Sequence, residues 1–165
     1  CLAVSQQRSA GQGVSFLQAD ICALNEIQSQ TIINFAPDCV VCWLMGASAD
    51  TTGATLHDGG KAVAAYREHI HRKIAELAAS LLTVNALHLV DRTAIPWQAK
   101  DIGRDTLVRY HAGKTLLDLP FNADRRNALY RKLGDNVVDM AAMRRPHPAL
   151  KSVVPTLASL LVERK

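Results

Sequence analysis

The sequence has few aromatic residues and lacks any long hydrophobic run. Aromatic side chains make up 5% of the 165 residues, while hydrophobic residues as a whole make up 48% and charged residues 21%. The longest apolar runs, such as Val40 to Met45, are far shorter than the roughly 20 residues that a membrane-spanning helix requires. We therefore expect a globular chain with no membrane partner, and the length fits a single domain over residues 1–165.

The sequence also lacks a strong excess of charge of one sign. Its 19 Lys and Arg residues against 15 Asp and Glu give a net charge of +4. The two signs alternate along most of the chain, with basic pairs only at Arg125-Arg126, Arg131-Lys132 and Arg144-Arg145. This balance permits contact with nucleic acid but does not indicate it.

Cysteine is present but not in a pattern that indicates disulfides or metal. Cys39 and Cys42 match C-x-x-C, yet they lie in an apolar, strand-like run, where positions three apart point to opposite faces. A redox pair instead needs an exposed thiol at a helix N-terminus. No histidine lies at zinc-finger spacing from these residues, so we expect no metal. The pattern predicts buried, reduced thiols and a cytoplasmic location.

Hydrophobic periodicity predicts alternating strands and helices. The continuous apolar run from Cys39 to Met45 is typical of a strand that is buried on both faces. Such alternation predicts an α/β fold, a three-layer sandwich with a mostly parallel sheet. The expected strands cover residues 14–19, 39–45, 84–90 and 136–143, and the expected helices residues 21–35, 61–82, 99–117 and 122–133, with a Gly-rich loop at 51–60 and a strand or helix at 156–162.

Ligands of parallel sheets bind beyond the carboxyl ends of the strands. In this sequence the expected ends carry Asp20, the segment from Gly46 to Asp50, and the segment from Asp91 to Trp97. We therefore expect the functional site to contain residues from these three places.

Four phrases together resemble a class I S-adenosylmethionine-dependent methyltransferase. Leu2 to Ile21 is similar to the helix, glycine turn and third strand of that family, which ends in an Asp-hydrophobic pair. Phe35 to Gly46 resembles its fourth strand and the following loop. The segment Leu87 to Asp91 looks like the fifth strand, and Thr156 to Lys165 looks like the closing strand. The resemblance implies a Rossmann-like fold, S-adenosylmethionine as cofactor and methyl transfer to an acceptor that the sequence does not identify.

By this resemblance, Asp20 would accept a hydrogen bond from the adenine amine and Ile21 would pack on the ring. The methionine end of the cofactor would lie against Cys42, Trp43, Leu44 and Gly46. The residues themselves leave other interpretations open. Asp20 can be the N-cap of the helix that follows, and the second group can be ordinary strand core.

The family's glycine-rich loop after the first strand is absent, as is the acidic residue that follows the second strand. Both would precede Cys1, which is not an initiator Met. We therefore expect the chain to be the C-terminal portion of a larger methyltransferase-like domain. An upstream segment or a second chain would then complete the sheet and the cofactor site.

Methyl transfer depends mainly on an in-line approach and sometimes on a base. Candidates for a base are His57, Asp50 and Asp58 on the Gly-rich loop, although each can equally be a solvated loop residue. Among the other histidines, His69 and His71 are two apart on a helix and cannot face one ligand. We expect His88 to be a hydrogen-bonded strand residue and His111 to be an exposed helix residue.

Two other classes of protein remain open. A flavodoxin-like Ser/His hydrolase is one, since Pro37 to Gly46 resembles its third block and Pro146-His147-Pro148 its histidine block. Its Gly-Asp-Ser nucleophile is absent from the sequence, however. The second is a non-catalytic α/β interaction module, which the missing glycine-rich loop favours.

Overall fold

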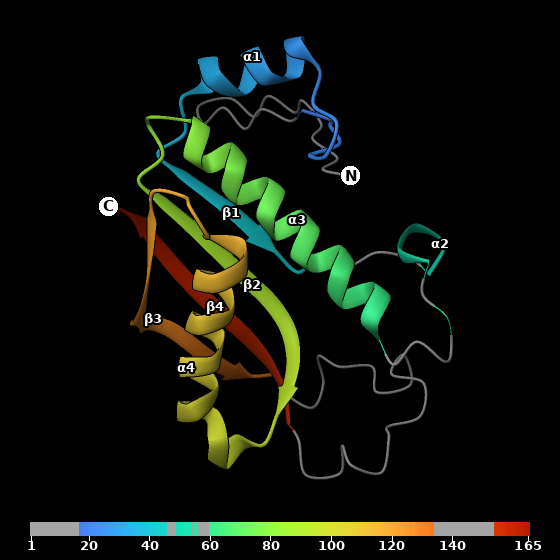
Figure 1. Ribbon diagram of the computed structural model, residues 1–165, viewed down its shortest axis with the longest axis vertical. Coiled ribbons are helices and arrows are strands. Elements are labelled where there is room, and N and C mark those ends of the chain that lie inside the picture. The colour runs from blue at the N-terminus through green and yellow to red at the C-terminus, as the bar shows by residue number, and fades with distance from the viewer. Residues whose placement is uncertain (1–16, 46–48, 54, 56–59, 134–153) are drawn as a thin grey trace, which may run out of the picture.

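The computed structural model describes residues 17–45, 49–53, 55, 60–133 and 154–165. These residues form an α/β fold in which helices pack against one four-stranded sheet (Figure 1). The predicted α/β class is therefore confirmed, and no helix in the described ranges is long and apolar enough to cross a membrane.

The sheet is mixed. Its strands are β1 (Cys39–Trp43), β2 (Ala86–Ile95), β3 (Phe121–Lys132) and β4 (Val154–Arg164), in the spatial order β1-β2-β4-β3. The pair β1 and β2 is parallel, whereas β4 is antiparallel to both β2 and β3. With one parallel pair in three, a mostly parallel, three-layer sandwich is not confirmed.

Two helices lie in front of the sheet in Figure 1. Helix α3 (Lys61–Ser80) contacts β1 and β2, and α4 (Lys100–Tyr110) contacts β3 and β4. A π-helical turn (His111–Thr115) continues α4 and packs on α3. The core lies between these helices and the sheet, because apolar side chains recur along α3 and at alternate positions of the two central strands. Its members include Ile70, Ile74 and Ala78 of α3, Leu87 and Leu89 of β2, and Leu160 and Val162 of β4.

Strand β1 lies at one edge of the sheet and is buried on one face only. Cys42 is 2% exposed, whereas Val41 and Trp43, whose side chains point to the other face, are 54% and 58% exposed. The prediction that this strand is covered on both faces is therefore wrong. Its continuous apolar run supplies core side chains on one face and a largely exposed apolar surface on the other.

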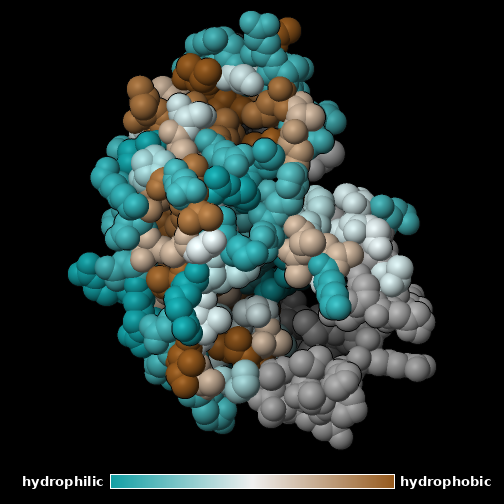
Figure 2. Space-filling model, viewed as in Figure 1, coloured by the Kyte–Doolittle hydropathy of each residue, from teal (hydrophilic) through white to brown (hydrophobic). Residues whose placement is uncertain are grey.

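Helix α1 (Glu26–Phe35) begins later than the periodicity predicts. Asn25 is its N-cap, in a capping box with Gln28: the Gln28 N–H donates to Asn25 Oδ1 (2.8 Å), and the Asn25 N–H donates to Gln28 Oε1 (3.0 Å). Asp20 is therefore not the N-cap. The helix buries no residue, and Ile27 and Phe35 are exposed. Figure 2 shows apolar atoms gathered in the upper part of the molecule, where α1 lies.

The helix expected over residues 122–133 is instead strand β3. This segment pairs with β4 along most of its length, and Phe121 and Ala128 are buried. Pairing with a distant strand thus overrides a sequence rich in helix-forming residues. The segment 156–162, for which strand and helix were both open, is a strand.

The remaining elements can be compared with the prediction where the structure describes them. The expected helices over 61–82 and 99–117 and the strand over 84–90 are confirmed as α3, α4 with its π-helical turn, and β2. A short helix, α2 (Ala49–Thr52), overlaps the start of the expected Gly-rich loop, and Trp97–Ala99 forms a 3-10 turn before α4. Of the strand expected over 14–19, the described part holds only an isolated bridge at Ala19, and 136–143 lies outside the described residues.

Candidate functional site

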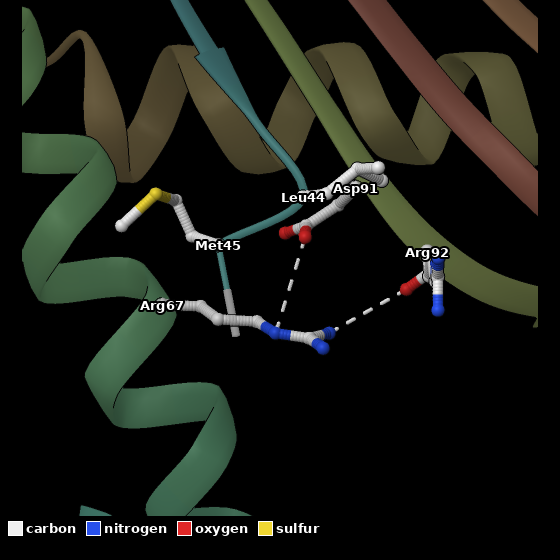
Figure 3. A pocket seen from close by; sticks show the side chains of 5 residues that line it. All are labelled: Leu44, Met45, Arg67, Asp91 and Arg92. Carbon is white, nitrogen blue, oxygen red and sulfur yellow. Dashed lines mark hydrogen bonds and ion pairs between the residues drawn. The ribbon is translucent and has the colours of Figure 1, made fainter. Parts of the chain in front are cut away.

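A hollow of about 250 Å³ lies at the carboxyl end of β1 (Figure 3). Leu44 and Met45, which follow β1, form one side of it. Asp91 and Arg92 of β2 and Arg67 of α3 form the rest. Asp91 lies in the middle of β2, but β1 ends opposite Val90, so this carboxylate stands just beyond the end of the parallel pair. Sheet topology therefore places the hollow where ligands of parallel sheets bind. We call it the β1-end cavity.

The polar side chains of this site come from one face of α3 and from β2. Arg67 and His71 are four residues apart on α3 and so point the same way. Arg67 Nε lies 3.9 Å from Asp91 Oδ1, and His71 Nε2 lies 3.5 Å from Asp91 Oδ2. Arg67 Nη1 donates to the carbonyl of Arg92 (3.5 Å).

Three atoms of this cluster are buried without a hydrogen-bond partner among the described residues: Arg67 Nε, His71 Nε2 and Asp91 Oδ1. Buried polar groups in folded proteins are normally hydrogen-bonded to protein or water. Here the three groups face one another at 3.5 and 3.9 Å, beyond good hydrogen-bonding distance, so the Asp91 carboxylate is held by the charge of Arg67 and the nearby imidazole.

A second hollow, of about 290 Å³, shares Arg67, Asp91 and Arg92 with the first. It extends between α3 and α4 above β2 and β4, and ring side chains contribute much of its wall. We call it the aromatic cavity. Its other lining residues are Ala64, His71, Thr93, Leu107, Tyr110, His111, Tyr130 and Ala158.

Burial sets the protonation of this cluster. It raises the pKa of the Asp91 carboxyl above its usual range, although the nearby Arg67 and His71 oppose the rise. Burial also lowers the pKa of His71, and lowers that of His111 to about 3 with a further contribution from His71. At neutral pH both imidazoles are therefore uncharged.

The expectation that His111 is exposed is wrong. This residue is 4% exposed, its Nδ1 is hydrogen-bonded to Thr115 Oγ1 (2.9 Å), and its ring centroid lies 5.6 Å from that of His71. His71 is 3% exposed, whereas His69 is exposed, so the prediction that these two cannot face one ligand is confirmed. The four-residue spacing of Arg67 and His71 is the sequence signal that could have indicated the cluster.

The predicted cofactor residues that the structure describes have different surroundings. Asp20 is exposed, and its Oδ1 accepts a hydrogen bond from the Cys22 N–H (3.0 Å). Ile21 is half-buried and packs against the edge of the core. Gly46 lies outside the described residues.

Only one of the other three predicted residues, Leu44, lines the β1-end cavity. Its backbone has φ of 55°, and its N–H donates to the carbonyl of Val90 (2.7 Å). The Cys42 side chain is buried in the core, where burial raises the pKa of its thiol to about 12. Trp43 points to the other face of the sheet. Of the predicted bases, Asp50 is exposed on α2, and His57 and Asp58 lie outside the described residues.

On that other face, a hydrogen-bonded chain crosses three strands. Trp43 Nε1 donates to His88 Nδ1 (3.2 Å), and His88 Nε2 lies 2.8 Å from Ser159 Oγ. The prediction that His88 is a hydrogen-bonded strand residue is confirmed.

This chain of contacts fixes the tautomer of His88. An indole can only donate, so His88 Nδ1 must accept and the proton of the neutral ring sits on Nε2. The imidazole then donates to Ser159 and cannot take its proton, which a serine nucleophile would require. This Ser-His contact gives no support to a hydrolase, and Pro146-His147-Pro148 lies outside the described residues.

The described residues contain no group of three side chains suited to hold a metal ion. Cys22, Cys39 and Cys42 are free thiols. Cys39 and Cys42 are unpaired, as predicted, but the prediction that these thiols are buried holds for Cys42 only, because Cys39 is exposed.

Comparison of the chain with protein-family models, curated proteins and solved structures finds no match.

Proposed function

We propose that this chain takes part in S-adenosylmethionine-dependent methyl transfer. The observation that carries the proposal is the pair of adjacent cavities that share Asp91 and Arg67 at the carboxyl end of the parallel pair. Methyl transfer needs two ligands held side by side in an in-line geometry. The two cavities would meet this need if one held the cofactor and the other the acceptor, with the Asp91 carboxylate between them.

The strand arrangement also supports the proposal. By the sequence resemblance, β1 corresponds to the fourth strand of the family and β2 to the fifth. In the doubly wound order 3-2-1-4-5-6 these two strands are parallel neighbours, as β1 and β2 are. We propose that a preceding segment or a second chain pairs with the outer edge of β1 and covers the other face, which would complete a three-layer, Rossmann-like sandwich.

The β1-end cavity fits part of the cofactor. When bound, S-adenosylmethionine supplies an electrophilic methyl group on a positively charged sulfonium. The Asp91 carboxylate, whose side chain is 21% exposed, is suited to this positive charge, and the side chains of Leu44 and Met45 are suited to the carbon chain of the cofactor. Asp20 and Ile21 remain predicted contacts of the adenine.

Asp91→Asn is expected to weaken binding of S-adenosylmethionine about tenfold, or roughly 1.4 kcal/mol, and to leave S-adenosylhomocysteine nearly unchanged. The reason is that only the first ligand carries the sulfonium charge, and the amide keeps the size of the carboxylate but not its charge. Calorimetric titration of both ligands against both proteins measures the difference.

The matched control is Asp101→Asn, which changes an exposed carboxylate on α4. It should alter neither affinity. If the unaltered chain gives no heat with either ligand at high micromolar concentration, the proposal is wrong and an interaction module becomes the better interpretation.

Asp20→Ala tests the adenine contact. It is expected to weaken S-adenosylhomocysteine binding by about 1–3 kcal/mol, because the amine of the adenine would lose its hydrogen-bond acceptor. Asn25→Ala is the comparison, since it removes the N-cap of α1 and should lower the melting temperature without changing the affinity. Equal affinity of the Asp20 variant and the unaltered chain would rule out the contact.

A further inference from the structure

The aromatic cavity has two chemically distinct parts. Its polar end is formed by Asp91 and Arg67, and its walls by the rings of Tyr110, His111 and Tyr130 together with Leu107 and Ala158. The Tyr130 hydroxyl donates to the carbonyl of Gly103 (3.1 Å), which fixes the position of its ring. A volume of about 290 Å³ suits a planar ligand of one or two rings that stacks against these walls.

The polar end selects among ligand groups by charge. A carboxylate would pair with Arg67 but would meet the negative charge of Asp91. A neutral hydroxyl can donate to the Asp91 carboxylate and accept from the Arg67 guanidinium at the same time, since both side chains line the cavity and remain 21% and 33% exposed. The opposite charges therefore favour a hydroxyl group.

The acidity of the hydroxyl group further limits the class of ligand. Phenols ionise near pH 10, as the tyrosine side chain does, whereas an aliphatic hydroxyl is about as weak an acid as water, with a pKa near 16. A carboxylate assisted by a guanidinium can take the proton of a phenol but not that of an aliphatic alcohol. Both the ring-lined walls and the polar end of the cavity therefore favour an aromatic alcohol as the ligand.

We propose that the aromatic cavity binds a phenol as methyl acceptor and that Asp91 takes its proton, an inference that rests on the proposed methyl transfer. The phenol oxygen forms a bond to the methyl carbon of S-adenosylmethionine as the bond from that carbon to sulfur breaks. The sulfur keeps the electron pair, the proton goes to the Asp91 carboxylate, and the products are the methyl ether and S-adenosylhomocysteine. Arg67 stabilises the negative charge that develops on the phenol oxygen.

Binding of 4-nitrophenol to the full chain without cofactor tests the site, because its phenolate is coloured and its phenol form is not. The apparent pKa of the bound probe is measured by a pH titration of its colour. Among the residues that the structure describes, the charged or titratable side chains that face the cavity are Arg67, His71, Asp91, Arg92, Tyr110, His111 and Tyr130.

Two variants should shift this pKa in opposite directions by about one unit. Arg67→Gln raises it, because the positive charge that favours the phenolate is gone, and Asp91→Asn lowers it, because a negative charge that opposes the phenolate is gone. The controls Arg109→Gln and Asp101→Asn change exposed charges on α4 and should leave it where it is. A purely structural role of Arg67 and Asp91 would not give opposite shifts.

The inference is overturned if 4-nitrophenol does not bind, if benzoate binds as tightly as the phenol, or if both variants shift the pKa in the same direction. Its failure is distinct from that of the proposed function. A chain that binds S-adenosylhomocysteine but no phenol loses only the acceptor class. A chain that binds the phenol but no S-adenosylhomocysteine keeps the aromatic-alcohol site and loses methyl transfer as its use.

Discussion

Replacement of Arg164 by methionine is expected to lower the free energy of unfolding by about 3–5 kcal/mol. The Arg164 guanidinium on β4 donates to the carbonyls of Ala78 (2.9 Å), Leu81 (2.8 Å) and Val84 (2.6 Å). The last carbonyls of a helix have no partner within the helix, and a cation at that end also interacts favourably with the helix dipole. Methionine keeps much of the side-chain volume but leaves these partly buried carbonyls unpaired.

Urea denaturation of the two proteins measures this loss. The control is Arg125→Met, which removes an ion pair with Asp105 in which both side chains are half-exposed. Although Arg125 Nε and Asp105 Oδ1 are only 2.6 Å apart, an exposed ion pair of this kind contributes less than about 1 kcal/mol to the free energy of unfolding. Equal losses in the two variants would show that Arg164 does not hold α3 to β4.

Acidification from pH 7 to pH 4 is expected to cost about 3 kcal/mol of stability through His111 alone. The pKa of this imidazole is about 3 in the folded chain and near 6.5 when unfolded. Below pH 6.5 the unfolded chain gains a proton that the folded chain does not bind, so stability falls steadily until the pH approaches 3. His71, whose pKa is also lowered by burial, adds to the loss in the same direction.

The variant His111→Asn isolates this contribution. The smaller asparagine leaves a void where the buried imidazole was, so the stability of the variant at pH 7 is lower. Between pH 7 and pH 4, however, the variant should lose about 3 kcal/mol less stability than the unaltered chain. His69→Asn, at an exposed position on α3, should leave the pH dependence unchanged. If His111→Asn loses as much stability as the unaltered chain on acidification, His111 is not the acid-sensitive group.

The sequence predicts those helices and strands whose pattern of apolar residues is visible within the segment itself. The long helix α3 has apolar residues at three- and four-residue steps, so its extent could be predicted within two residues. Strand β3 could not, because its Ala, Arg and Leu residues favour a helix and only its pairing with β4, which follows it along the chain, makes it extended. Likewise, nothing local to β1 distinguishes a strand covered on both faces from one with an apolar exposed face.

The polar cluster around Asp91 lies where the sequence predicts a candidate site, but the sequence does not predict the residues of α3 that belong to the cluster. The rule that ligands bind at the carboxyl ends of parallel strands led to the segment containing Asp91, and the cluster lies there. The sequence alone does not indicate Arg67 and His71, because charged and titratable residues on an amphipathic helix commonly face solvent. Their role depends on where α3 lies across the sheet, which is set by the packing of Ile70, Ile74 and Ala78 rather than by any motif.

The order of the strands has a consequence for how fast the chain reaches its native state. Strand β4 comes after β2 and β3 in the sequence but lies between them, so β3 has no neighbour, and β2 has only β1, until β4 pairs with both. The contact between His88 and Ser159, for example, joins residues 71 positions apart. Pairings of such long range slow folding, because the entropy of closing the loop is lost before the contacts form. Refolding from denaturant should therefore be slow compared with a helical bundle of this length, with helix α3 gaining structure before the sheet.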